Sequence, residues 1–188
     1  MKNISGIVGL DLSITGSGFS RWDIRKNCNS KLQTIGTKPN FGFIMERLEY
    51  SASIIISGIE KNDIVFIEDY AFGVRPGISR LASLAELGGI IKFLVYRKTG
   101  KSTVQVASTT IKKWLSGSGK LPHSDFKIAA YKKYGIDFNT KDEVIAFSVM
   151  TFGRYLLKAN DRKLLKYEEE VIKNFKKKHP EILHMFAN

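Results

Sequence analysis

The chain has 188 residues, 43% of them hydrophobic, and carries 30 Lys and Arg against 18 Asp and Glu, a net charge of +12. That length and hydrophobic content are typical of one globular domain and argue against a disordered chain. The charge favours a polyanionic partner, with nucleic acid ahead of an anionic membrane surface, because each neutralised phosphate releases condensed counterions. The single cysteine, Cys28, excludes an intrachain disulfide and any cysteine-based metal cluster.

The start of the chain predicts two strands joined by a glycine-rich turn. Residues 6–12 are nearly continuously apolar, and residues 17–24 alternate roughly between apolar and polar side chains. A third strand is predicted over 31–37. Helical spacing follows over 43–59, and the apolar run at 64–69 predicts a buried strand that ends in acids.

The second half of the chain predicts helices alternating with a short strand. After a loop at 70–77, the small residues and leucines of 78–96 predict a core helix. We expect the remaining elements to be a strand at 102–108 and helices at 109–115, 125–134 and 142–157. Strands that come first and then alternate with helices indicate an α/β protein with a mixed sheet.

The last part of the chain, from Lys158, mixes Lys, Arg and Glu in blocks. We expect a charged helix there that packs loosely on the body and is a candidate for binding a polyanionic backbone. The chain is therefore divided into a domain at 1–157 and a basic helical extension of that domain at 158–188. No apolar run reaches the ~18 residues of a membrane span, and the N-terminal apolar stretch is too short for a signal peptide. We therefore expect a cytoplasmic protein with no membrane partner.

Acidic residues stand at the ends of two predicted strands and at the start of a helix. Asp11 and Glu68 end the strands, and Asp142 and Glu143 begin the last strong helix. Because a buried carboxylate is costly unless it is paired or bound to a cation, such acids converging on one spot would suit a divalent metal. Two metal ions about 4 Å apart suit phosphodiester hydrolysis, since one activates water and the other stabilises the leaving oxygen.

Each acid also has a purely structural interpretation. Asp11 could cap the turn that follows it, and Glu68 could form an ordinary ion pair at a strand end. Asp142 and Glu143 are favourable charges at a helix N-terminus. The segment GSGK at 117–120 is an incomplete phosphate loop, so no nucleotide cofactor is expected.

Four segments together resemble the RuvC-type Holliday junction resolvases of the ribonuclease H-like superfamily: IVGLDLSITGSGF, DIVFIEDYAFG, TVQVASTTIKKWLSGSGK and DEVIAFSVM. The resemblance covers roughly residues 6–153. It implies an α/β fold of the ribonuclease H-like type, a mixed five-stranded sheet flanked by helices, with 1–157 as the nuclease domain. A compact chain rich in Lys and Asn also suits a phage-encoded member of such a family.

The resemblance implies a metal-dependent endodeoxyribonuclease. Such an enzyme acts as a homodimer and resolves four-way DNA junctions, a form of branched DNA, by paired symmetric nicks. The implied cofactor is Mg²⁺, for which Mn²⁺ can substitute, with two ions in each active site. Asp11 matches the family's first-strand aspartate, and Glu68 matches its strand-end glutamate.

The resemblance leaves the far end of the implied metal site open. The family usually carries two acids three residues apart at the start of the last helix. If Asp142 takes the first of these positions, Ile145 replaces the second acid; if Asp142 takes the second, Asn139 stands at the first. In either arrangement Glu143 is the candidate that compensates for the missing acid.

The resemblance also assigns roles to basic residues near the scissile phosphate. Lys120 is implied as a catalytic residue, and Lys112 and Lys113 are implied to bind DNA beside it. Their proposed work is to position the phosphate and to stabilise charge in the transition state. The alternative is that they are ordinary solvated lysines.

A third set of implied DNA-binding residues follows the strand-end glutamate. Tyr70 and Phe72 stand where the family carries an aromatic side chain that stacks on opened bases, although core packing is an equal alternative. Arg75 and Arg80 are expected to track phosphates. The helix at 78–95 is the expected dimer surface, because symmetric cutting needs two active sites that face two strands.

Three other functions remain open at this stage. The same carboxylates would serve a nuclease of this fold that acts on flaps, RNA–DNA hybrids or other branched substrates. The missing acid would suit a catalytically inactive junction-binding protein. The sugar-kinase and actin-like fold also begins with an apolar strand, an Asp and a Gly turn, but its second phosphate loop is not found in this sequence.

Overall fold

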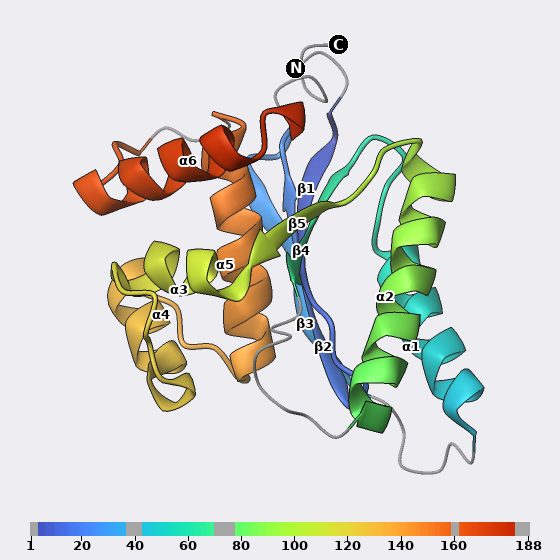
Figure 1. Ribbon diagram of the computed structural model, residues 1–188. Coiled ribbons are helices and arrows are strands. Elements are labelled where there is room, and N and C mark those ends of the chain that lie inside the picture. Colours follow the sequence, from blue (N-terminus) through green and yellow to red (C-terminus); the bar gives the residue numbers. More distant parts are fainter. Residues whose placement is uncertain (1–3, 37–42, 70–77, 159–161, 183–188) are drawn as a thin grey trace.

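The protein is described here from a computed structural model, which covers residues 4–36, 43–69, 78–158 and 162–182 (Figure 1). The strands of its single sheet are β1 (Gly6–Asp11), β2 (Gly16–Asp23), β3 (Cys28–Gly36), β4 (Ile64–Asp69) and β5 (Val104–Ala107). The α-helices are α1 (Ile44–Ser57), α2 (Ile78–Thr99), α3 (Ser108–Ser116), α4 (Phe126–Tyr134), α5 (Lys141–Leu156) and α6 (Lys166–Lys178). A short 3-10 helix, His123–Asp125, precedes α4.

The sheet is mixed, as the sequence predicts. Its strand order is β3-β2-β1-β4-β5, in which β1, β2 and β3 form an antiparallel meander. The other neighbours, β1 with β4 and β4 with β5, are parallel. The carboxyl ends of these three parallel strands therefore lie at the same edge of the sheet, which is where the acids of β1 and β4 stand.

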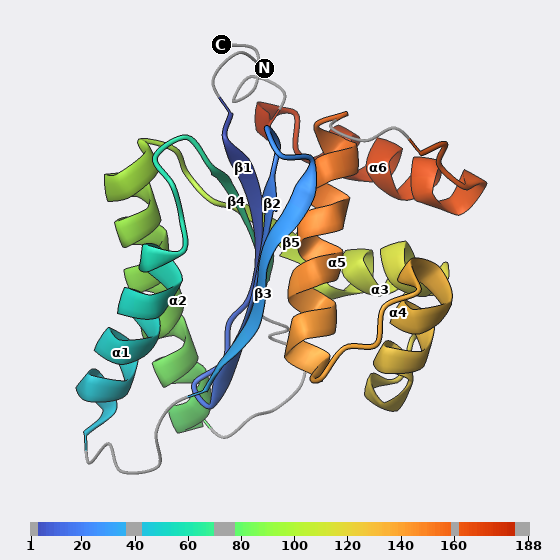
Figure 2. The same ribbon diagram turned by 180° about the vertical axis from the view of Figure 1, so that it is seen from behind.

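Helices cover both faces of the sheet (Figures 1 and 2). Helices α1 and α2 lie on one face, over a core that includes Val8 and Ile67 of the strands. On the other face α5, with α3, α4 and α6, covers a core that includes Ile7 and Phe66. Because successive side chains of a strand point to opposite faces, burial on both faces explains why the central strands are almost continuously apolar.

Glycines bring α5 unusually close to the sheet. A Cβ atom on Gly9 would lie 2.2 Å from the carbonyl oxygen of Ala146, and one on Gly18 would lie 2.0 Å from the carbonyl oxygen of Asp142. On the helix side, a Cβ on Gly153 would lie 2.6 Å from the ring of Phe66. The lack of side chains at these positions lets the backbone of α5 lie directly on β1, β2 and β4, which fixes where its first turn sits.

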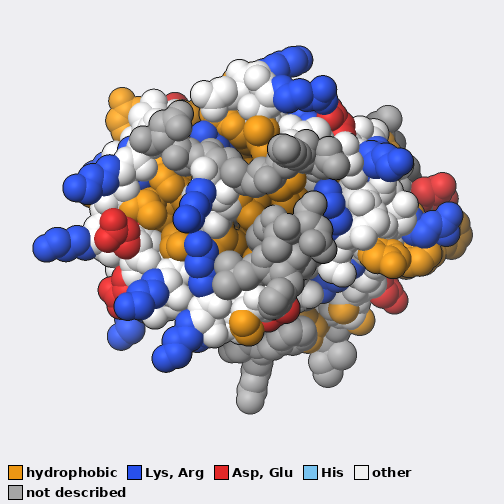
Figure 3. All heavy atoms as spheres, turned by 90° about the horizontal axis from the view of Figure 1, so that it is seen from above, with side chains coloured by type: hydrophobic (Ala, Val, Ile, Leu, Met, Phe, Trp, Pro, Cys, Tyr) orange, Lys and Arg blue, Asp and Glu red, His pale blue; other side chains and the backbone are white. Residues whose placement is uncertain are grey.

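Charge is spread widely over the surface. Figure 3 looks down on the end of the molecule that carries α6 and shows Lys and Arg side chains around the periphery, including the side where α6 lies. None of the described helices is long and apolar enough to cross a membrane.

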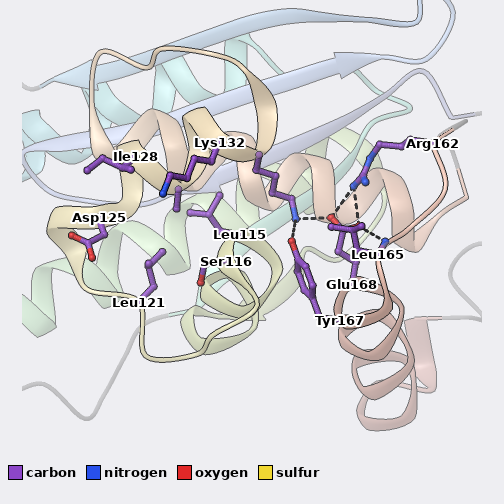
Figure 4. Close-up of a pocket in the computed structure, with 12 residues that line it drawn as sticks. Leu115, Ser116, Leu121, Asp125, Ile128, Lys132, Arg162, Leu165, Tyr167 and Glu168 are labelled. Carbon is purple, nitrogen blue, oxygen red and sulfur yellow. Dashed lines mark hydrogen bonds and ion pairs between the residues drawn. The ribbon is translucent and has the colours of Figure 1, made fainter.

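The prediction that the C-terminal helix packs loosely is wrong. On α6, Val171, Ile172 and Phe175 are buried in the same core as α5. The fully buried carboxylate of Glu168 accepts hydrogen bonds from Lys133 Nζ at 2.6 Å and from Arg162 at 2.7 Å (Figure 4). The high charge of this segment hides a buried stripe at helical spacing, and that stripe makes α6 an integral part of the fold.

The helix α2 also differs in detail from its prediction. Its core face is formed by the large residues Leu87, Ile91 and Val95, which are almost fully buried. The small residues Ala82 and Gly89 are instead exposed, so they do not serve close packing within the chain. Large apolar residues hold the helix on the sheet because their burial removes more apolar surface from water.

Candidate active site

The register of the parallel strands places Asp11 and Glu68 side by side. Leu10 pairs with Ile67, so the next residue of each strand is one of these two acids. Gly9 and Phe66 face α5. Gly9 lies two positions before Asp11, and Phe66 lies two positions before Glu68. Because side chains alternate along a strand, Asp11 and Glu68 project from the same face of the sheet, toward the start of α5.

The first turn of α5 brings Asp142 to the same edge. It lies over the hairpin between β1 and β2, where Gly18 pairs with Asp11. A Cβ atom on Gly16 would stand 3.5 Å from Asp142 Oδ2, and the peptide carbonyl of Asp142 occupies the space above Gly18. Three acids from three separate segments are thus gathered between the sheet edge and the helix.

Burial makes the ionised form of these acids unfavourable, and repulsion by neighbouring acids adds to this at Asp11. Burial raises the pKa of Asp11 well above its usual range, and the negative charges of Glu68 and Asp142 raise it further. Burial also raises the pKa of Glu68, against the lowering effects of a hydrogen bond from Ser108 and the positive charges of Lys141 and Lys112. The pKa of Asp142 is raised by burial as well. Such a group is stabilised by taking up either protons or a cation.

The turn after Asp11 is held by hydroxyl groups. Ser17 Oγ donates to the carbonyl oxygen of Ser13 at 2.9 Å and accepts from the Ser13 backbone N–H at 3.1 Å. The backbone N–H of Thr15 donates to Ser13 Oγ at 3.4 Å. Among the described residues no hydrogen bond of this turn uses the Asp11 side chain, so capping does not explain the acid.

Glu143, in contrast, performs the structural task that a helix N-terminus offers. Its backbone N–H donates to Thr140 Oγ1 at 3.1 Å, and its own Oε2 accepts from the Asn139 backbone N–H at 3.0 Å. The first bond is the N-cap of α5, and the second ties the residue before that cap to the first turn of the helix. The carboxylate is 6% exposed and is engaged at the cap, so the structure does not group it with Asp11 and Glu68.

The structure also bears on the two arrangements of the last helix. Ile145 is 3% exposed and belongs to the apolar core beneath α5, so position 145 does not face the acids. Asn139 is exposed and precedes the helix cap at Thr140. Of the two acids at the start of α5, Asp142 is the one whose charge acts on Asp11.

Lysines flank the acids on two sides. Lys112 of α3 and Lys141 of α5 both act electrostatically on Glu68. Lys113 and Lys120 are exposed, and no contact among the described residues joins either one to the three acids. Tyr70, Phe72 and Arg75 lie outside the described residues, as does the side chain of Arg80.

Sequence reasoning missed two neighbours of the acids and one residue beside the lysines. The sequence predicts Ser108 at the end of a strand, but it begins α3 and hydrogen-bonds Glu68. Lys141 directly precedes Asp142, and no pattern marked it. His123 lies close enough to Lys141 and Lys112 that their charges, after its own burial, lower its pKa. The one available signal was the position of Ser108 directly after the apolar residues of a predicted strand.

The fit of this site to a divalent cation depends on the carboxylates of Asp11 and Glu68. Within the described ranges, no group of three or more His, Cys, Asp and Glu side chains is close enough together to hold a metal ion. Asp11 and Glu68 are nevertheless neighbouring carboxylates of raised pKa, and none of the ion pairs among described residues uses either one. Carboxylate oxygens are hard donors that fit Mg²⁺ or Mn²⁺, so Asp11 and Glu68 would hold such an ion, with Asp142 as the third acid at this edge.

Comparison with known proteins supports the fold. Neither a protein family nor a curated protein matches the sequence. In structure, the chain is similar to Thermus thermophilus RuvC in complex with a Holliday junction substrate, with a TM-score of 0.65, 15% identity, and coverage of 80% of this chain and 94% of that one. A second Thermus thermophilus RuvC structure matches with a TM-score of 0.61, 14% identity, and coverage of 80% and 96%. The chain therefore has a RuvC-like fold, which confirms the ribonuclease H-like prediction.

Proposed function

We propose that the protein is a metal-dependent endonuclease that resolves four-way DNA junctions by paired symmetric nicks. The observation that carries the proposal is the group of acids at the carboxyl ends of β1 and β4, where Asp11 and Glu68 have raised pKa values and form no ion pair with another described residue. A solved structure with the same fold holds a Holliday junction substrate. The positive net charge of +12 suits a nucleic-acid partner.

Asp11 and Glu68 are the proposed metal ligands, with Asp142 as a third. Bound Mg²⁺ or Mn²⁺, in the proposal two ions, would supply an activated water and stabilise the leaving oxygen. Ser108 orients the Glu68 carboxylate through its hydrogen bond. Lys112 and Lys141 offset the negative charge around Glu68 and would hold the phosphate of the strand to be cut.

The remaining contacts belong to the same proposal. Lys113 and Lys120 would bind the DNA backbone beside the cleavage site. We assign the same partner to the segment that follows Glu68, with Tyr70 and Phe72 on bases and Arg75 and Arg80 on phosphates. Two copies of the chain, paired through α2, would present two active sites to two strands.

One cleavage experiment tests the proposal. The protein and Asp11→Asn are incubated with a synthetic four-way junction, a flap and a linear duplex, each with Mg²⁺ and with Mn²⁺. We expect paired symmetric nicks in the junction alone, and a loss of at least about a thousandfold in rate for Asp11→Asn. Cutting confined to the flap would assign the site to another nuclease. Binding without cutting under either metal would refute an enzyme.

A second pair of variants separates the two acids of α5. We expect Asp142→Asn to lower the cleavage rate while leaving the fold intact. Glu143→Gln is expected to lower the stability of the fold by about 1 kcal/mol, because it weakens the hydrogen bond from the Asn139 backbone N–H. A greater loss of cleavage in folded Glu143→Gln than in Asp142→Asn would reverse the assignment.

A further inference from the structure

A basic groove runs between α3 and α6, with a volume of about 580 Å³. These two helices lie next to each other on the α5 side of the sheet (Figure 1). Three of its lining residues are lysines, Lys113 of α3 and Lys177 and Lys178 at the end of α6, and His179 follows them. Glu170 is the one acid among the lining residues. The groove is therefore a concave surface of net positive charge.

The groove begins beside the catalytic acids. Ala107 lines it and pairs with Asp69, the residue after Glu68, in the register of β5 with β4. The next residue, Ser108, hydrogen-bonds Glu68. On the same helix Lys112 acts on Glu68 while its neighbour Lys113 lines the groove. One short helix thus connects the acids to the groove.

The walls of the groove are held firmly. Trp114 of α3 is fully buried, and its Nε1 donates to Thr151 of α5 at 3.3 Å. On the other wall Phe175 of α6 is 4% exposed and packs edge-on against Phe152, with ring centroids 4.9 Å apart. The positions of the lysines on these walls are therefore set by the core and not by contacts among the lysines themselves.

The lysines of the groove are not paired with acids in the part of the chain that the structure describes. Among the described residues none of Lys113, Lys177 and Lys178 takes part in an ion pair, although Lys133 nearby does. Lysines in a last helical turn are favourable for the helix dipole, which accounts for Lys177 and Lys178 on α6 alone. The helix dipole does not explain why these side chains line the same groove as a lysine from α3, since like charges brought together repel. A bound polyanion would remove that repulsion.

The remaining polar lining suits the same partner. Thr109, Thr110 and Asn174 line the groove together with the lysines. Hydroxyl and amide groups of this kind are common donors to phosphate oxygens, and such contacts carry no base specificity. Lysines and neutral donors along an open groove are typical of a surface that binds a nucleic-acid backbone irrespective of sequence.

We propose that this groove binds the sugar–phosphate backbone of one duplex arm of the DNA, beyond the site of cleavage. This inference rests on the proposed function and extends it to α6, which becomes part of the DNA-binding surface. Its role is to add affinity and to fix the direction in which the arm leaves the acids. The contacts are electrostatic, so they are sensitive to salt.

The test compares two double variants of α6 that make the same change in charge. Lys177→Gln with Lys178→Gln removes two groove lysines. Lys166→Gln with Lys173→Gln removes two exposed lysines of the same helix that do not line the groove. Both are made in Asp11→Asn, so that the DNA stays intact, and thermal unfolding confirms that each is folded. Dissociation constants for a four-way junction and for a linear duplex are then measured across a series of salt concentrations.

We expect the groove variant to raise the dissociation constant for the junction about tenfold at physiological salt. The slope of log affinity against log salt should fall by about 1 for each lysine that contacts a phosphate. The control pair should leave both quantities unchanged. This difference would show that position, and not total charge, determines binding.

The other outcomes separate the inference from the proposed function. If Asp11→Asn binds the junction tightly and the two pairs behave alike, the groove proposal is refuted and the proposed nuclease stands. If the groove pair weakens binding to the linear duplex and the protein shows no preference for the junction, the groove stands and junction resolution is refuted. If the protein binds neither DNA, both are refuted.

Discussion

The two ends of the β1–β4 strand pair both carry buried acids, but they differ in what neutralises them. At the amino ends, the fully buried Asp63 accepts hydrogen bonds from Arg21 Nε at 2.8 Å and from Arg21 Nη2 at 3.0 Å, and a third from Ser5 at 2.8 Å. At the carboxyl ends, Asp11 and Glu68 face each other and another acid. The same two strands thus present an acid paired with a buried arginine at one end, and at the other end two acids that form no ion pair with another described residue.

The Glu168 cluster on α6 follows the pattern of Asp63. Burial alone would raise the pKa of Glu168, but the hydrogen bonds from Lys133 and from the Leu165 backbone N–H lower it. At both Asp63 and Glu168, the folded protein supplies basic side chains to a fully buried acid. Repulsion of the kind found among Asp11, Glu68 and Asp142 is therefore not a general feature of the fold. The difference supports a role for these three acids in binding an external cation.

The largest effect is expected from breaking the ion pair of Asp63 with Arg21. Asp63→Asn leaves the Arg21 guanidinium buried with a weaker partner, which should cost about 3 kcal/mol of unfolding free energy. Urea unfolding measures this loss. The control is Glu60→Gln, since Glu60 also pairs with Arg21, at 2.9 Å, but is 52% exposed and should contribute no more than about 1 kcal/mol. Equal losses in the two variants would contradict the role given to burial.

The next effect concerns how α5 positions Asp142. In Gly18→Ala the new Cβ would lie 2.0 Å from the Asp142 carbonyl oxygen, so the first turn of α5 must shift. We expect a loss of about 2 kcal/mol in stability and a lower cleavage rate at saturating metal. Gly89→Ala on α2 is the control, because its Cβ meets no atom within 4 Å and alanine favours a helix. Full activity in a folded Gly18→Ala would show that the position of Asp142 is unimportant.

A divalent cation should stabilise only the end of the strand pair that carries Asp11 and Glu68. At a concentration about ten times its dissociation constant, Mg²⁺ should add about 1.4 kcal/mol to the unfolding free energy. Calorimetry with and without EDTA measures the shift. Asp11→Asn should abolish it, whereas Asp63→Asn should retain it on a less stable background. A shift that survives in Asp11→Asn would place the cation elsewhere.

The smallest effect is expected from the change of aspartate to asparagine at Asp11. This substitution should raise the unfolding free energy, whereas the same substitution at Asp63 lowers it. Without metal at neutral pH, Asp11→Asn should stabilise the fold by about 1 kcal/mol, because it removes a carboxylate whose ionised form is disfavoured. Since the folded pKa of Asp11 is raised, the folded wild type takes up a proton before the unfolded chain does as the pH falls. The gain should therefore shrink between the raised pKa and the ordinary value of 3.8. Paired urea titrations across this range measure it, and a gain that grows with acid would contradict the raised pKa.

Local patterns in the sequence were sufficient for the strands and for the two acids at their ends. The apolar runs before Asp11 and Glu68 require buried strands, because only burial on both faces tolerates so few polar side chains. The capping role of Glu143 was within reach of the sequence too, since Thr140 and Glu143 have the spacing of a capping box.

The order of strands and helices, the positive charge and the candidates Asp11, Glu68 and Asp142 all follow from the sequence. That these three acids lie at the same edge of the sheet does not follow from it, because their placement depends on the register of β1 with β4 and on the glycines beneath α5. The tertiary structure likewise decided that α6 belongs to the core, that Ser108 and Lys141 lie beside the acids, and that a basic groove begins there. Such proximity depends on packing between segments far apart in the chain, and no local pattern of residues encodes it.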